Sequence, residues 1–172
     1  MVQSPAHLPG EHTLPSLAIC AKDIMQKDVV WGNPDESVQQ ALTKMQQADS
    51  GYMIAGTDGV IEGIVSKSDI TGAISPYLRP LFAKWRRPLD DATLQIKIKW
   101  IMARPVRTIK PGTSLEAIME SMSQLGGRCM PVVDQQSKVQ GLVTVFDIFK
   151  ALLQYTSNVS TTGKTNQAPP LV

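Results

Sequence analysis

Two stretches of the chain repeat one pattern of apolar and polar residues. In each stretch, four apolar residues stand at positions i, i+3, i+4 and i+7, the spacing of one buried face of a helix. The positions are Val38, Ala41, Leu42 and Met45 in the first stretch and Leu115, Ile118, Met119 and Met122 in the second. Thr113 and Glu116 stand where a capping box would begin the second helix. The pattern therefore predicts two amphipathic helices that bury the same stripe.

Two short apolar runs, joined by a polar turn, follow each predicted helix. The runs are 52–55 and 60–65 in the first half and 129–133 and 139–143 in the second. Short apolar runs between turn residues are typical of buried strands, so each half is predicted to form strand, helix, strand, strand, helix. Neither half alone can bury both sides of so small a sheet. We therefore expect an α+β fold in which two pseudo-symmetric β-α-β-β-α repeats pack sheet to sheet.

The step from the last strand into the last helix is the same in both halves. Residues 63–70 and 141–148 each read Gly, two aliphatic residues, a hydroxyl residue, two variable positions, Asp and Ile. The first N–H groups of a helix lack partners within it, so the hydroxyl can cap them or help to hold a phosphate. The Asp lies on the same face and its two oxygens can accept both hydroxyls of a ribose. A capping arrangement without a ligand is the alternative interpretation.

Composition narrows the range of functions. With 172 residues, 42% hydrophobic and 19% charged, the chain has an ordinary globular composition, and its net charge of +2 does not call for a nucleic-acid or membrane partner. It has no apolar run of membrane-spanning length and no signal-peptide pattern, so we expect a cytoplasmic protein with Cys20 and Cys129 as reduced thiols. Because its only histidines are His7 and His12 and it has no Ser-His-Asp set or metal-ligand cluster, we do not expect an enzyme.

Changes in composition along the chain divide it into five segments. We predict a flexible arm at 1–17, a first repeat at 18–74, an insertion at 75–97, a second repeat at 98–154 and a disordered tail at 155–172. The insertion carries apolar residues that can form one face of a short helix: Tyr77, Leu78, Leu81, Phe82 and Trp85. Its cationic run at 84–87 is followed at once by Asp90 and Asp91, which argues against nucleic-acid binding. We interpret the insertion as cover for a sheet edge or as a dimer contact.

The doubled pattern resembles the CBS-domain family, as a tandem pair or Bateman module, over residues 18–153. The resemblance rests on the Ile-Met pairs at 24–25 and 101–102, on Cys-Met-Pro-Val-Val-Asp at 129–134 and on Gly-Leu-Val-Thr-Val-Phe-Asp-Ile at 141–148. The first repeat departs from the pattern at Ile54, where the family has proline, and at Gly56. The resemblance implies a regulatory module that binds adenosine-containing ligands in two clefts between the repeats.

Carried over to this sequence, the resemblance implies two sets of nucleotide-binding residues. The first cleft takes Ile64 against the base, Ser66, Lys67 and Asp69 for phosphate and ribose, and Val106, Arg107, Thr108, Gly127, Arg128 and Cys129 from the other repeat. The second takes Leu142, Thr144 and Asp147, with Val29 to Trp31, Gly51 and Tyr52 from the other repeat. Lys67 and Arg128 make the Asp69 cleft the more positive one, which favours a phosphorylated nucleotide there. As alternatives, Lys67 and Arg128 can be solvated, and Trp31 and Cys129 can be packing residues.

Two functions follow as hypotheses. The first is a sensor that binds AMP, ADP, ATP or S-adenosylmethionine, needs no resident cofactor, forms a homodimer and signals to an unknown effector protein. The second is a constitutive dimerisation or assembly module with empty clefts, in which Trp85 or Phe82 of the insertion anchors the contact.

Overall fold

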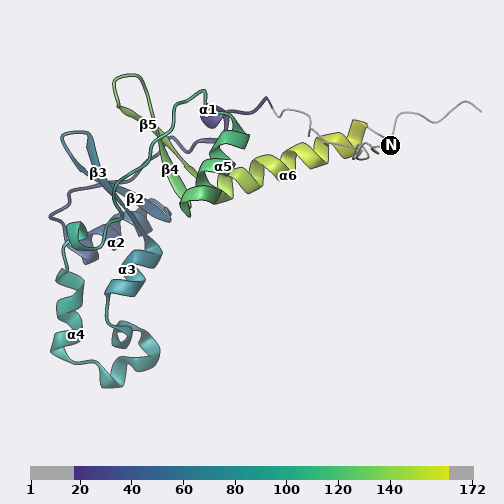
Figure 1. Ribbon diagram of the computed structural model, residues 1–172. Coiled ribbons are helices and arrows are strands. Elements are labelled where there is room, and N and C mark those ends of the chain that lie inside the picture. The colour runs from purple at the N-terminus through teal and green to yellow at the C-terminus, as the bar shows by residue number, and fades with distance from the viewer. Residues whose placement is uncertain (1–17, 163–172) are drawn as a thin grey trace, which may run out of the picture.

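Two small sheets form the centre of the protein (Figure 1). The computed structural model describes residues 18–162. Strands β1 (Trp31–Gly32), β2 (Tyr52–Thr57) and β3 (Val60–Ser66) form one sheet in that order, with β1 parallel and β3 antiparallel to β2. Strands β4 (Cys129–Val133) and β5 (Val139–Thr144) form the other as an antiparallel pair. The counterpart of β1 in the second sheet is a single parallel bridge between Ile109 and Val132.

Helices α2 (Val38–Gln47) and α5 (Leu115–Leu125) are the two predicted amphipathic helices. Their stripes are buried at Val38, Ala41, Met45, Leu115, Ile118 and Met122, while Leu42 and Met119 are partly buried against the same clusters. The expected capping box at Thr113 and Glu116 is wrong. Ser114 caps α5, because its hydroxyl accepts from the Ala117 N–H, and the Thr113 hydroxyl instead accepts from the Lys110 N–H. The predicted fold class is confirmed.

Each hydrophobic core includes a segment from the other half of the chain. Helix α1 (Ala21–Ile24) belongs to the core of the second half, where the N–H of Ala21 donates to Thr113 O at 2.9 Å. The short 3-10 helix Ile98–Trp100 in turn belongs to the core of the first half, where the N–H of Ile98 donates to Glu36 O at 2.9 Å. The chain that leads into each repeat is therefore part of the opposite core, which ties the two halves together.

The insertion extends away from both sheets (Figure 1). After α3 (Lys67–Ala73) it forms 3-10 helices at Pro76–Leu78, Pro80–Trp85 and Thr93–Gln95, with α4 (Pro88–Ala92) among them. Its two ends are joined at Ser75, whose hydroxyl donates to Asp90 Oδ1 at 2.6 Å and whose N–H donates to Thr93 Oγ1 at 3.0 Å. One helix with an apolar face was expected, and the prolines divide the segment into short pieces instead.

The last helix, α6 (Val145–Thr162), is longer than the composition predicts. It projects from β5 past the sheets (Figure 1) and includes residues 155–162, which were expected to be a disordered tail. The hydroxyls of Thr156 and Ser157 both donate to Leu153 O at 2.9 Å, so these polar residues are accommodated within the helix. The predicted arm at 1–17 and residues 163–172 lie outside the described residues. No helix in 18–162 is long and apolar enough to span a bilayer.

Candidate functional site

Ser66 and Asp69 stand at the junction of β3 and α3. The Ser66 hydroxyl accepts from the Asp69 N–H at 3.1 Å, and Asp69 Oδ2 accepts from both the N–H and the hydroxyl of Ser66 at 2.7 Å. This is the capping arrangement, and it uses one carboxylate oxygen only. Within the described residues Asp69 Oδ1 has no hydrogen-bond partner, and the residue is half-buried. Capping therefore leaves an acceptor free for a ligand.

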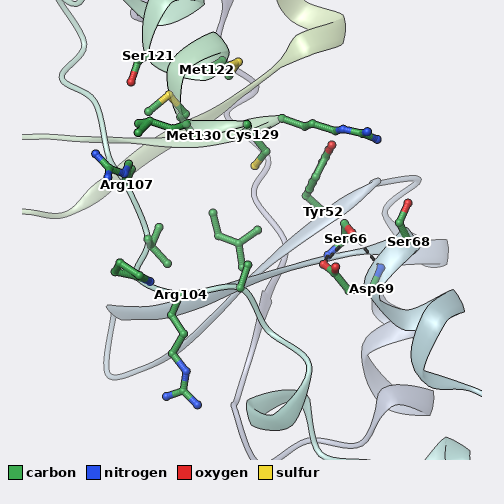
Figure 2. Close-up of a pocket in the computed structure, with 18 residues that line it drawn as sticks. Tyr52, Ser66, Ser68, Asp69, Arg104, Arg107, Ser121, Met122, Cys129 and Met130 are labelled. Carbon is green, nitrogen blue, oxygen red and sulfur yellow. Dashed lines mark hydrogen bonds between the residues drawn. The ribbon is translucent and has the colours of Figure 1, made fainter.

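A cavity of about 580 Å³ opens beside Asp69. Figure 2 shows Tyr52, Ser66 and Asp69 on one side of it and Arg107 on the other, with Cys129 and Met130 on the wall between them. The residues predicted for this cleft that line the cavity are Ile64, Ser66, Asp69, Val106, Arg107, Gly127, Arg128 and Cys129. Thr108 does not line it, and Lys67 lines a neighbouring cavity of about 460 Å³ together with Arg128. The structure thus brings together one acid from the first repeat and three arginines from the second, Arg104, Arg107 and Arg128.

Several lining residues were not expected from the sequence. Ala103, Arg104 and Pro105 extend the wall formed by Val106, while Ser121 and Met122 reach it from α5. The only feature of the sequence that could have indicated residues 103–105 is their position directly before the predicted segment 106–108. Tyr52 was assigned to the second cleft but lines the first, because β2 lies next to β3 and its first residue pairs with Ser66.

Two of the three arginines that line the cavity have no ion pair or hydrogen bond among the described residues. Arg107 and Arg128 are exposed, and neither side chain has an ion pair or hydrogen bond among the described residues. Arg104, by contrast, donates to Lys99 O at 3.0 Å. Partial burial is the main cause that raises the pKa of Tyr52; the Asp69 carboxylate also raises it and Arg128 lowers it, and the net shift is upward, so the phenol stays neutral at pH 7. The cleft therefore offers two free guanidinium groups, one carboxylate oxygen and a phenol.

Cys129 lies in β4 and lines the same cavity. Burial, and after it the charge of Asp147, raises the pKa of its thiol to about 12, so the thiol is protonated at neutral pH. Both Cys129 and Cys20 are free cysteines, as predicted. No group of three or more His, Cys, Asp or Glu in residues 18–162 is arranged to hold a metal ion.

The second cleft has the same backbone but a different interior. Asp147 Oδ2 accepts from the Thr144 N–H at 2.8 Å and the Thr144 hydroxyl at 2.7 Å, which repeats the arrangement at Asp69. Here, however, Gln26 Nε2 lies 3.0 Å from both oxygens of Asp147. Asp147 is only 6% exposed and Thr144 only 4%. Both oxygens of this carboxylate therefore accept hydrogen bonds from within the chain.

The residues predicted for the second cleft are not gathered around a cavity. Leu142 is buried, and the three cavities that we describe in residues 18–162 include none of Leu142, Thr144 and Asp147. Val29, Val30 and Trp31 line none of these cavities either; Trp31 in β1 lies close to Gly56 of β2. Gly51 and Tyr52 line the cavity that contains Lys67. The two predicted clefts therefore differ strongly in what they offer a ligand.

The described residues thus form a pair of α+β repeats, with the acidic helix start at Asp69 facing a cleft between them. The family model of the CBS domain matches residues 21–76 and 98–154, and this chain belongs to the CBS-domain family. A relative named uncharacterized protein MJ1426, from Methanocaldococcus jannaschii, is 26% identical over 151 residues, covering 77% of this chain and 90% of that protein. The inosine-5'-monophosphate dehydrogenase of the same organism is 24% identical over 131 residues, but this chain covers only 23% of it.

Solved structures show the same fold. The CBS domain pair of protein MJ0100, in complex with 5'-methylthioadenosine and S-adenosyl-L-methionine, matches with a TM-score of 0.65 and 22% identity over 82% of this chain and 99% of that one. The structure of CBSX2 in complex with AMP matches with a TM-score of 0.61 and 21% identity over 80% and 98%. At these identities the likeness shows the shared fold.

Proposed function

We propose that this protein is a regulatory sensor that binds an adenine nucleotide in the Asp69 cleft. The observation that carries the proposal is the cavity of about 580 Å³ that joins a free oxygen of Asp69 to the unpaired Arg107 and Arg128 of the other repeat. This volume lies within the usual range for sites that hold small molecules. Two relatives of the same fold have AMP or S-adenosyl-L-methionine bound, which supports an adenosine-type ligand.

Each part of such a ligand has a counterpart in the cleft. A ribose hydroxyl donates to Asp69 Oδ1, the base lies between the aliphatic side chains of Ile64 and Val106, and the phosphate meets Arg107 and Arg128. Because the two guanidinium groups are free and exposed, we favour AMP, ADP or ATP over the unphosphorylated S-adenosylmethionine. Both repeats contribute to the cleft, so the ligand bridges them and stabilises one relative arrangement, which a partner protein or second copy can recognise.

A binding experiment with matched variants tests the proposal. In Asp69→Asn the amide keeps an oxygen that can accept from the Ser66 N–H, but it places an N–H₂ donor where a free acceptor stood. Loss of a hydrogen bond to a charged acceptor costs roughly 1.5–3 kcal/mol, so we expect calorimetric titration to show AMP affinity reduced about 10- to 100-fold. Asp147→Asn, the matched control, should keep the wild-type affinity. Equal affinity of both variants and the wild type for all four candidate ligands would remove the sensor function.

The alternative function is a constitutive assembly module, and the insertion is the observation that favours it. Tyr77, Phe82 and Trp85 form a ring cluster with centroid separations of 6.2 and 6.1 Å, while Leu81 and Leu89 are each 79% exposed. Exposed apolar side chains of this kind are typical of protein contacts. Sedimentation of Leu81→Glu/Leu89→Glu checks this role, since a dimer that depends on the insertion should become a monomer. A dimer that persists would count against it.

A further inference from the structure

The chain forms the same backbone bridge two residues before each hydroxyl-x-x-Asp step. At the second cleft, Gln26 and Leu142 exchange two N–H···O bonds of 2.9 Å. At the first cleft, Ala103 and Ile64 exchange two such bonds, of 2.8 and 3.1 Å. In both cases the partner strand goes on to the hydroxyl residue and the Asp of the helix start. Since the backbones agree, the side chains at positions 26 and 103 determine the difference in front of each Asp.

The side chain of Gln26 stands where a ligand would donate. Its Nε2 lies 3.0 Å from Oδ1 and 3.0 Å from Oδ2 of Asp147, so one amide group covers the pair of oxygens that could accept a diol. Ala103 has no polar atom on its side chain, lines the open cavity and leaves Asp69 Oδ1 without a partner among the described residues. A glutamine at position 26 therefore satisfies one carboxylate from within the chain, while an alanine at position 103 leaves the other for a ligand.

We infer that Gln26 is an internal occupant of the ribose position in the second cleft and limits the chain to one nucleotide. The inference rests on the proposed function, which it deepens by setting the stoichiometry. It also identifies position 26 and its counterpart, position 103, as the residues that decide which cleft binds.

The structure indicates that the two residues can be exchanged. Gln26 is itself exposed, so its removal uncovers Asp147 without leaving a cavity in the core. Alanine already forms the same bridge at position 103, so Gln26→Ala should keep the backbone in place. The second cleft has Val30 and Gly51 where the first has Arg107 and Arg128, so a freed second cleft lacks the two unpaired guanidinium groups that would bind a phosphate. Adenosine, which has the ribose and base without a phosphate, is therefore the appropriate probe for it.

Calorimetric titration of the full chain with AMP and with adenosine, up to millimolar concentrations, tests the inference. In separate titrations, the wild type should bind one AMP per chain and one adenosine per chain. Gln26→Ala should bind two adenosines per chain. Ala103→Gln should bind AMP at least tenfold more weakly, because the new amide reaches Asp69. The control Gln47→Ala removes an exposed glutamine on α2 and should match the wild type.

The outcomes separate the inference from the proposed function. Two adenosines per wild-type chain, or one per chain in Gln26→Ala, would overturn the role of Gln26 while leaving the Asp69 site intact. Undiminished AMP binding by Ala103→Gln would overturn it as well. Failure of the wild type to bind any of AMP, ADP, ATP, S-adenosylmethionine and adenosine would overturn the proposed function itself.

Discussion

The two clefts share a backbone and a hydroxyl-x-x-Asp step, yet they present different chemistry. Asp69 is half-buried beside a cavity, with Arg107 and Arg128 across it, whereas Asp147 is 6% exposed and bonded to Gln26. In both cases the first function of the Asp is to cap its helix. The hydroxyl-x-x-Asp step by itself therefore specifies a helix cap. In the second cleft Gln26, from the opposite repeat, covers both oxygens of the carboxylate, whereas in the first cleft Ala103, its counterpart, leaves one oxygen without a partner among the described residues.

After the loss predicted for Asp69→Asn, the next largest change in AMP affinity should come from the two unpaired arginines of the Asp69 cleft. Replacing both, in Arg107→Met/Arg128→Met, removes the two unpaired guanidinium groups from the Asp69 cleft and leaves Arg104, which donates to Lys99 O. An exposed ionic contact contributes roughly 1 kcal/mol at most, so we expect AMP affinity to fall up to about 30-fold by calorimetry. Adenosine affinity should stay unchanged, because adenosine has no phosphate. The exposed Arg79 in the insertion provides the control variant, Arg79→Met. An equal loss for AMP and adenosine would show that the arginines act by shaping the cleft.

A smaller effect is expected on the free energy of unfolding, to which the two helix caps at Ser66 and Thr144 should contribute unequally. Thr144 is 4% exposed and its hydroxyl donates to a buried carboxylate, whereas Ser66 is half-buried at an open cleft. Loss of a cap costs about 0.5–2 kcal/mol, with buried caps at the upper end, so Thr144→Ala should lower the free energy of unfolding more than Ser66→Ala does.

Urea denaturation measures both changes. Thr144→Ser keeps the hydroxyl and isolates the lost methyl group, so it should recover most of the stability lost in Thr144→Ala. A Ser66→Ala variant that loses as much stability as Thr144→Ala would break the proposed division between an open cleft and a closed one.

The smallest effect concerns Cys129, which lines the same cavity as Asp69 and has a pKa raised from 9.0 to about 12. The folded state holds this proton more tightly than the unfolded chain, so the stabilisation is complete below pH 9 and is lost as the pH rises toward 12. At pH 10 the loss relative to pH 7 should be about 1 kcal/mol of unfolding free energy. Denaturation of the wild type and Cys129→Ala across this range measures it, and identical pH slopes would contradict the role of burial.

Much of the fold could be predicted because it is encoded twice. The helical stripes and paired apolar runs recur at a fixed spacing, so each repeat supports the interpretation of the other. The cap at Ser114 was missed because Thr113 is also a capping residue and sequence alone does not choose between neighbours. The helical continuation of α6 was missed because Thr156 and Ser157 favour loops unless their hydroxyls bond back to the helix, as both do to Leu153.

The site was less predictable than the fold. Asp69 and the segments at 106–107 and 127–129 could be assigned to one cleft from the sequence, because the register of the two repeats fixes their positions. The closure of the other cleft could not be foreseen, because nothing in the sequence marks Gln26 as different from any surface glutamine. Its effect arises from a bridge between residues far apart in the chain, Gln26 and Leu142.

A crystal structure of the protein grown with AMP is the most direct test of whether the Asp69 cleft alone binds a nucleotide. We predict one nucleotide per chain, with a ribose hydroxyl on Asp69 Oδ1, the phosphate beside Arg107 and Arg128, and Gln26 still bonded to Asp147. A nucleotide bound against Asp147 with the Asp69 cavity empty would contradict this account.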